Sequence, residues 1–133
     1  KTAERLREFS HSLPEISRVA VLDGEIVAVC RVWPLVVGEA RTRALFYGPV
    51  AVTPEQRGSR LGQAVTVAAL EAGEAQGWPA AVLIGAPAYF CEIGFEVTPR
   101  GQLVFPGPQD QGRVMVKSLA GDASQLSGLV TAL

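Results

Sequence analysis

The stretch from Val50 to Ala64 constrains the fold more than any other, because it leads from an apolar strand end through a short loop into a long helix. The loop reads Arg57-Gly58-Ser59-Arg60-Leu61-Gly62. The first amide groups of a helix have no acceptor inside the helix, and they carry the positive end of its dipole. A strand, a glycine-containing loop and a helix N-terminus in this order therefore favour a site for an anion such as a phosphate.

The side chains of this loop suit the same ligand. Arg57 and Arg60 can donate paired hydrogen bonds to phosphate oxygens, and the glycines at 58 and 62 let a ligand approach the backbone closely. Two common phosphate-binding patterns are absent, since neither G-x-x-x-x-G-K-[ST] nor G-x-G-x-x-G after a strand occurs in the sequence. Read by itself, the loop leaves open an ordinary strand-to-helix turn on a solvated surface.

Composition narrows the class of protein. The chain has 133 residues, of which 48% are hydrophobic and 19% charged, and this suits one folded domain over residues 1–133. The formal net charge of −1 argues against a general binder of nucleic acid or of membrane surfaces. No apolar run is long enough to span a membrane, and the N-terminus does not resemble a signal peptide, although Lys1 in first place leaves room for a missing N-terminal piece.

The two cysteines, Cys30 and Cys91, are too few for a disulfide framework. We expect both thiols to be unpaired, in a cytoplasmic protein.

The first half of the chain predicts an antiparallel meander. A helix end over 3–11 is followed by strands over 16–22, 25–37 and 41–52, which are rich in β-branched residues. The dipeptides Asp23-Gly24 and Gly38-Glu39 form the turns between these strands. Pro49 lies inside the third strand and has no N–H to donate, so it marks an edge, a bulge or a point where two strands separate.

The second half predicts a βαβ unit and a hairpin. A helix over 57–76 ends near Gly77 and leads to a strand over 80–85, parallel to the third strand because a whole helix connects them. A short helix over 87–93 follows, and then strands over 102–105 and 113–119 form a C-terminal hairpin around the loop 106–112. Residues 122–133 leave open a terminal helix or an irregular segment with a strand near 129–131.

This order of elements and two motifs resemble the GCN5-related N-acetyltransferases. The loop at 57–62 is similar to the acetyl-CoA motif R/Q-x-x-G-x-G/A of that family, and Ala86 to Phe95 resembles its second signature, an aromatic pair before Gly-Phe. The resemblance covers about residues 17–119, and small bacterial N-acetyltransferases are the most similar members. It implies an α/β fold with a mixed sheet, an antiparallel meander, a central βαβ unit and a C-terminal hairpin, with the N-terminal strand and helix mostly missing.

The resemblance also implies acetyl-CoA as the acetyl donor and a primary amine of a small molecule or peptide as the acceptor. The amides of the loop would hold the pyrophosphate, Val50 to Val52 would pair with pantetheine, and an N–H near Val50 would donate to the acyl oxygen. The residues implied for acetyl-CoA are Val50, Ala51, Val52, Arg57, Gly58, Ser59, Arg60, Leu61, Gly62 and Gln63. The net charge argues against nucleic acid and membrane as partners, no cluster of metal-ligand residues stands out in the sequence, and a homodimer stays open.

Two positions depart from the pattern of the family. Arg60 stands where the middle glycine of the motif is usual, and there it either crowds the pyrophosphate or gives it a cation. Phe90 stands where many relatives have the tyrosine that acts as general acid. A shift of one helical residue is a rotation of about 100°, so we expect the neighbouring Tyr89 to face away from that position.

Tyr89 and Tyr47 are the candidate proton donors, and both have ordinary structural interpretations as packed aromatic residues. Cys91 is a weak further donor. For the base, Glu55 and Glu92 are candidates that are better explained as solvated side chains, and His11, the one histidine, lies outside the motifs.

Two functions therefore stay open. One is an acetyl-CoA-dependent N-acetyltransferase, and the other is a catalytically weak acyl-CoA-binding or interaction module that keeps the fold. Arg60 and Phe90 are the residues that favour the second.

Overall fold

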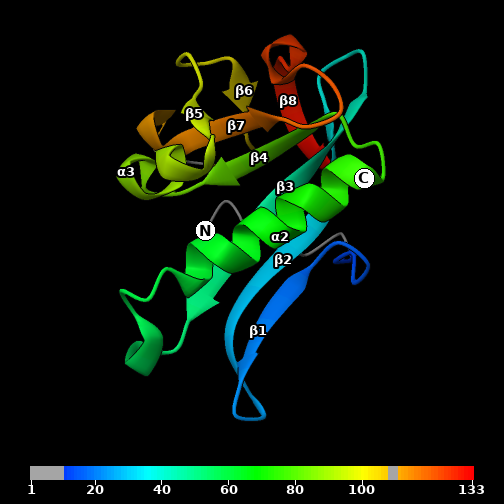
Figure 1. The fold of residues 1–133 in the computed structure, drawn as a ribbon. Coiled ribbons are helices and arrows are strands. Elements are labelled where there is room, and N and C mark those ends of the chain that lie inside the picture. The colour runs from blue at the N-terminus through cyan, green and yellow to red at the C-terminus, as the bar shows by residue number, and fades with distance from the viewer. Residues whose placement is uncertain (1–10, 108–110) are drawn as a thin grey trace.

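The predicted meander is confirmed. The computed structural model describes residues 11–107 and 111–133, so the predicted helix end at 3–11 lies almost wholly outside the described residues. Three antiparallel neighbours open the sheet (Figure 1): β1 (Arg18–Leu22), β2 (Glu25–Val37) and β3 (Thr42–Val52). Asp23 and Gly24 join β1 to β2 with φ values of 51° and 80°, the left-handed pair that a tight hairpin turn requires.

Helix α2 (Leu61–Ala75) connects β3 to β4 (Ala80–Ile84), and these two strands are parallel as predicted. The helix begins four residues later than predicted, because residues 54–56 form the 3₁₀ turn η1 (Pro54–Gln56) and Arg60 is left-handed, with φ 66°. A left-handed residue cannot continue a right-handed helix, so α2 starts only after it. At the other end Gly77 has φ 85°, as expected beyond a helix C-terminus.

The C-terminal part differs from the prediction in its strand partners. The short helix predicted over 87–93 is divided into α3 (Pro87–Phe90) and the 3₁₀ turn η2 (Cys91–Ile93). Four strands follow, with a 3₁₀ turn before each of the last two: β5 (Glu96–Val97), β6 (Leu103–Val104), η3 (Gln111–Arg113), β7 (Val114–Ser118), η4 (Ala123–Gln125) and β8 (Gly128–Ala132). The order in the sheet is β5-β7-β4-β3-β2-β8-β6, with β1 beside β2.

The predicted hairpin between 102–105 and 113–119 is therefore wrong, because these two strands do not pair with each other. Strand β7 pairs antiparallel with β4 and with the unpredicted two-residue strand β5, whereas β6 pairs parallel with β8. Such short strands carry too little alternation to specify a partner, and packing decides instead. The alternative of a strand near 129–131 is confirmed, because β8 lies antiparallel beside β2.

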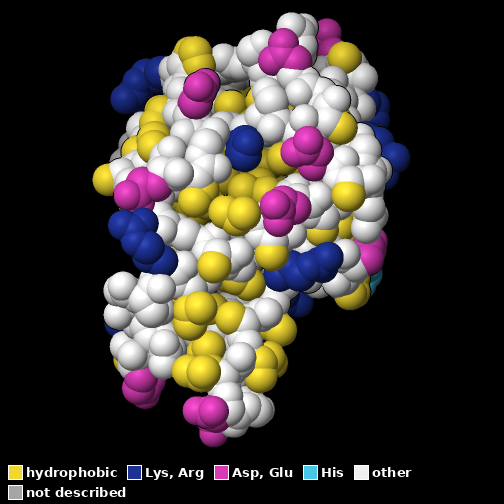
Figure 2. Space-filling model, in the orientation of Figure 1, with side chains coloured by type: hydrophobic (Ala, Val, Ile, Leu, Met, Phe, Trp, Pro, Cys, Tyr) yellow, Lys and Arg dark blue, Asp and Glu magenta, His cyan; other side chains and the backbone are white. Residues whose placement is uncertain are grey.

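The sheet has a hydrophobic core on each face. On one face α2 packs against the meander, with Val65, Ala69 and Leu70 among its buried residues. On the other face Trp33 and Phe46 pack against residues of the C-terminal part of the chain, namely Leu103, Phe105, Val114, Ala123, Leu126 and Val130. At the free end of the β1–β2 hairpin, exposed hydrophobic side chains gather above acidic ones (Figure 2).

Candidate active site

Strands β3 and β4 part at Pro49. Their ladder joins only Leu45 to Ala81 and Phe46 to Val82, although both strands continue beyond it. On the other side of β3, the pairing with β2 is irregular between Cys30 and Val32, opposite this same stretch. A gap thus opens between two parallel strands, as the proline predicted, and a cavity of about 360 Å³ lies there.

The edge of β3 that faces the gap carries polar backbone groups. The amide of Thr53 donates to the carbonyl of Val27 on β2 at 2.9 Å, so by alternation the amides of Val50 and Val52 point to the opposite edge, toward β4. Both residues line the cavity in the gap. A ligand with amide groups could pair with this edge as a further strand would.

A second cavity, of about 440 Å³, lies at the N-terminus of α2. The residues that line it are Val52, Gln56, Arg57, Gly58, Arg60, Leu61, Gly62, Gln63, Tyr89 and Glu92. At Gly62 an added Cβ would collide with the hydroxyl of Tyr89 and come within 3.1 Å of Val52, so a side chain there would displace Tyr89. The predicted loop, except Ser59, is thus brought together around one concave site, which the first amides of α2 adjoin; the amide and hydroxyl of Ser59 donate to the carbonyl of Gln56.

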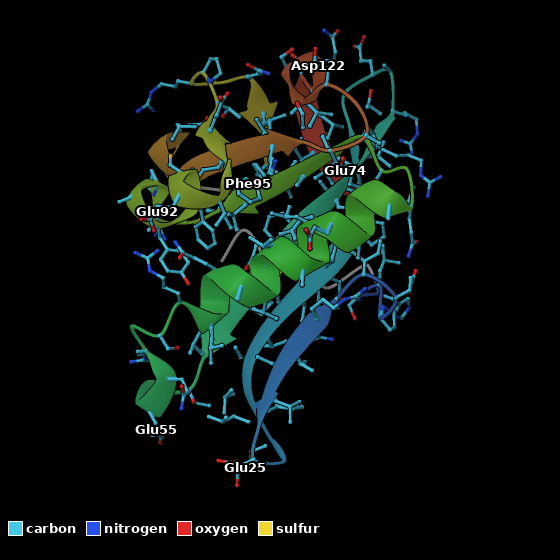
Figure 3. The ribbon with its side chains drawn as sticks, viewed as in Figure 1. Glu25, Glu55, Glu74, Glu92, Phe95 and Asp122 are labelled. Atoms are coloured by element: carbon cyan, nitrogen blue, oxygen red, sulfur yellow. The ribbon has the colours of Figure 1, made fainter. Side chains whose placement is uncertain are left out.

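Arg60 takes the backbone conformation that the usual glycine would take. Its φ of 66° is left-handed, and its guanidinium points to Gln63 and Glu92, whose oxygens lie 3.1 Å and 3.4 Å from Nη1. The ion pair with Glu92 is exposed and therefore weak. Figures 2 and 3 show this edge, where basic side chains lie next to the acidic one labelled Glu92.

Replacing Arg60 by glycine should stabilise the fold. A left-handed L-residue costs about 1–2 kcal/mol, and the greater freedom of glycine in the unfolded chain offsets part of that gain, so Arg60→Gly should raise the free energy of unfolding by about 0.5–1 kcal/mol. Chemical denaturation measures this quantity. The matched control is Arg57→Gly, because Arg57 has φ −65° and its replacement should lower the free energy of unfolding. A loss of stability in Arg60→Gly would show that the Glu92 contact outweighs the backbone strain.

Gln63 ties the start of α2 to α3. Its side chain is 6% exposed, and its Nε2 donates to the carbonyl of Tyr89 at 3.0 Å and to the carboxylate of Glu92. It was expected among the acetyl-CoA-binding residues, and in the structure it bridges the two elements that line the cavity at the N-terminus of α2. Glu92, expected to be a solvated side chain, is half-exposed and also lines the cavity.

Tyr89 lies between the two cavities and lines both of them. Its hydroxyl lies against Gly62 at the start of α2, whereas the ring of Phe90 packs over Gly85. The two neighbouring side chains thus point to different places, in line with the rotation of about 100° per helical residue. Phe90 is turned inward, where its ring packs over Gly85 and lies edge-to-face with Tyr89 and Phe95, at centroid distances of 4.8 Å and 6.1 Å.

Tyr47 is fully buried, and its hydroxyl donates to the carbonyl of Ala69 in α2 at 3.0 Å. Gly73 provides the space for that hydroxyl, since a Cβ there would come within 2.5 Å of it. Burial raises the pKa of Tyr47. The other candidates lie outside this site: Glu55 is on the exposed turn η1 (Figure 3), and His11 is exposed at the start of the described chain.

Both cysteines are unpaired, as expected. Cys30 is buried, and burial raises the pKa of its thiol to about 11, whereas Cys91 is exposed. Within the described residues no group of His, Cys, Asp and Glu could hold a metal ion, and no helix has the length and hydropathy needed to cross a membrane.

Sequence reasoning missed Arg113, which lines the cavity in the gap. It follows the loop 106–112 and belongs to neither motif, so no pattern in the sequence marks it. Only the pairing of β7 with β4 brings it to the end of β4.

Neither the family models nor the curated proteins that were compared match this chain. Solved structures do. A GNAT family N-acetyltransferase (YhbS) from Escherichia coli in complex with CoA is 27% identical with a TM-score of 0.77, over 86% of this chain and 65% of that one. A GNAT family acetyltransferase from Brucella melitensis in complex with acetyl-CoA is 22% identical with a TM-score of 0.69, over 88% and 65%. Tetrahymena GCN5 is 14% identical with a TM-score of 0.56, over 77% and 67%.

The chain thus spans about two thirds of the length of the first two structures. The similarity extends beyond the two motifs to most of the described chain. The chain has the fold of the GCN5-related N-acetyltransferases, which confirms the resemblance drawn from its motifs.

Proposed function

We propose that this protein is an acetyl-CoA-dependent N-acetyltransferase that acts on a primary amine of a small molecule or peptide. The observation that carries the proposal is the parting of β3 and β4 at Pro49, with the polar edge of β3 leading to the N-terminus of α2. The similar structures that carry CoA or acetyl-CoA support it.

The residues present fit the cofactor. The amides of Gly58, Arg60, Leu61 and Gly62, with the side chain of Arg57, would hold the pyrophosphate, whereas the amide of Ser59 donates to the carbonyl of Gln56. Val50, Ala51 and Val52 offer a strand edge for the amide groups of pantetheine. When bound, acetyl-CoA would supply an acyl group activated as a thioester.

The chain can assist the transfer chiefly by position, an effect worth about 7–11 kcal/mol in favourable cases. The amine of the acceptor forms a C–N bond to the acyl carbon as the C–S bond breaks. The amide of Val50 would donate to the acyl oxygen, where negative charge develops. We assign the proton for the departing sulfur to Tyr89, which lines the gap and whose hydroxyl would turn there from its place against Gly62, whereas the hydroxyl of Tyr47 is bonded inside the core.

The amine must lose a proton, and no carboxylate or histidine occurs among the described residues that line the gap. We assign that proton to water. Without a base in the gap, the rate should rise with pH until the amine of the acceptor is neutral.

Arg57→Ala should weaken acetyl-CoA binding about 10- to 100-fold, since one charge-assisted bond to a phosphate contributes about 1.5–3 kcal/mol. Titration calorimetry at low and moderate salt measures this loss. Arg100→Ala, which removes an exposed arginine that lines neither cavity, is the matched control. Equal dissociation constants in wild type and Arg57→Ala would exclude Arg57 from the site.

Phe90 in place of the usual tyrosine favours a second candidate, an acyl-CoA-binding module without useful catalysis. Calorimetry with acetyl-CoA, followed by a thiol-release assay over a panel of amines, separates the two candidates. Binding with release of CoA that depends on an amine supports the enzyme. Binding without release on any amine supports the module.

A further inference from the structure

We infer that the acceptor is an amine that carries a carboxylate, such as an apolar amino acid, and that Arg113 binds this carboxylate. The inference rests on the proposed acetyl transfer and adds the class of acceptor. Three observations carry it: the lining of the gap, the way in which Arg113 is held, and the separate place for phosphates.

The cavity between β3 and β4 is apolar apart from a few groups. Its lining residues are Phe46, Tyr47, Gly48, Pro49, Val50, Val52, Leu83, Ile84, Gly85, Ala86, Tyr89, Phe90 and Arg113. Among them Arg113 has the one charged side chain, and none is acidic. With pantetheine beside Val50 and Val52, the acceptor would take the end of the cavity at Gly85, where the ring of Phe90 packs and Arg113 is held. An acceptor with an aliphatic or aromatic body suits this mostly hydrocarbon lining.

Arg113 is fixed at the end of β4 by two hydrogen bonds to one residue. The amide of Gly85 donates to the carbonyl of Arg113 at 3.0 Å, and Nε of Arg113 donates to the carbonyl of Gly85 at 3.2 Å. The terminal nitrogens of the guanidinium face no carboxylate among the described residues. A planar guanidinium held by Nε and open at its terminal nitrogens is suited to a forked pair of bonds with a carboxylate.

The phosphates of the acetyl donor have a different place. The cavity at the N-terminus of α2 is lined by Arg57, Arg60 and the loop amides, and Arg113 does not line it. An acceptor with several positive charges, such as a polyamine, would meet the cation of Arg113, and the described residues that line the gap offer it no carboxylate. Charge therefore favours a single amine paired with an anionic group.

The test compares matched acceptors in wild type, Arg113→Gln and the control Arg100→Gln. The acceptors are leucine, methionine and phenylalanine, the methyl esters of the same amino acids, and spermidine. In Arg113→Gln, kcat/KM should fall about 10- to 100-fold for the amino acids, which is the loss expected for one charge-assisted bond. For the esters, kcat/KM of Arg113→Gln should stay within about threefold of the wild-type value. Each acceptor is compared between wild type and variant, so the lower amine pKa of an ester affects both values equally and drops out of their ratio.

Two further measurements keep the result specific. Arg113→Lys should recover part of the lost kcat/KM, and calorimetry should give wild-type acetyl-CoA affinity for all variants, with thermal melting as the check of folding. Equal losses for amino acids and esters, a preference of the wild type for spermidine over the amino acids, or weakened acetyl-CoA binding in Arg113→Gln would overturn the inference while acetyl transfer stands. Acetyl-CoA binding without acetylation of any amine would instead overturn the proposed function, and this inference with it.

Discussion

Tyr89→Phe should lower kcat about 100- to 10,000-fold at pH 7, because it removes the proton donor beside the gap. The hydroxyl of Tyr89 lies close to Gly62 at the start of α2, and the residue lines both cavities. A CoA thiol has a pKa near the model value of ~8.5, so its thiolate leaves unaided more readily at high pH. The difference between wild type and variant should therefore shrink above about pH 8.5, which steady-state kinetics across pH would measure.

Two variants separate this role from the alternatives. Tyr47→Phe should lower the free energy of unfolding by about 1 kcal/mol through loss of the bond to Ala69, with kcat close to wild type. Phe90→Tyr should raise kcat only if the lack of a tyrosine hydroxyl at position 90 limits the rate. If Tyr89→Phe leaves kcat unchanged on an acceptor that is acetylated, the proton comes from solvent and the assignment of Tyr89 is wrong.

Phe95→Ala should lower the free energy of unfolding by about 3–5 kcal/mol, the range for truncating a buried phenylalanine. Phe95, labelled in Figure 3, is 2% exposed, and its ring meets that of Phe90 edge-to-face. Phe90 in turn contacts Tyr89, so the same variant should lower kcat under conditions in which it is still folded. Denaturation by urea at 25 °C gives the first quantity, and kinetics well below the melting temperature give the second.

Val97→Ala is the control for that experiment, because Val97 follows shortly after in β5 but is 43% exposed. It should change the free energy of unfolding by less than about 1 kcal/mol. A loss of that small size in Phe95→Ala would mean that the aromatic contacts do not hold α3 in place.

The meander and the βαβ unit could be predicted because their signals are local and long. The Asp23-Gly24 turn fixes one hairpin, and a strand of 13 residues such as β2 shows its pattern over its whole length. Strand β5 has two residues and β6 has two, so neither carries a pattern that could name its partner. The place of β6 goes with burial of Leu103 and Phe105 against the sheet, which depends on residues far apart in the chain.

In the candidate site, too, the features with a local sequence signal could be predicted and those set by tertiary contacts could not. The loop 57–62 was found because glycine, arginine and a helix start stand next to one another in sequence. The left-handed backbone at Arg60 was not expected, although the usual glycine at that position indicates it. Arg113 could not be found, since its place beside Gly85 depends on the pairing of β7 with β4.

The most direct test of the account is a crystal structure of the protein soaked with acetyl-CoA. The account predicts the pyrophosphate against the amides of Gly58 to Gly62 other than that of Ser59, and pantetheine in the gap between β3 and β4, bonded to Val50 and Val52. It also predicts that the hydroxyl of Tyr89 turns from its place against Gly62 to within hydrogen-bonding reach of the thioester sulfur. Acetyl-CoA bound elsewhere, or a gap without ligand at concentrations that saturate binding in solution, would contradict the account.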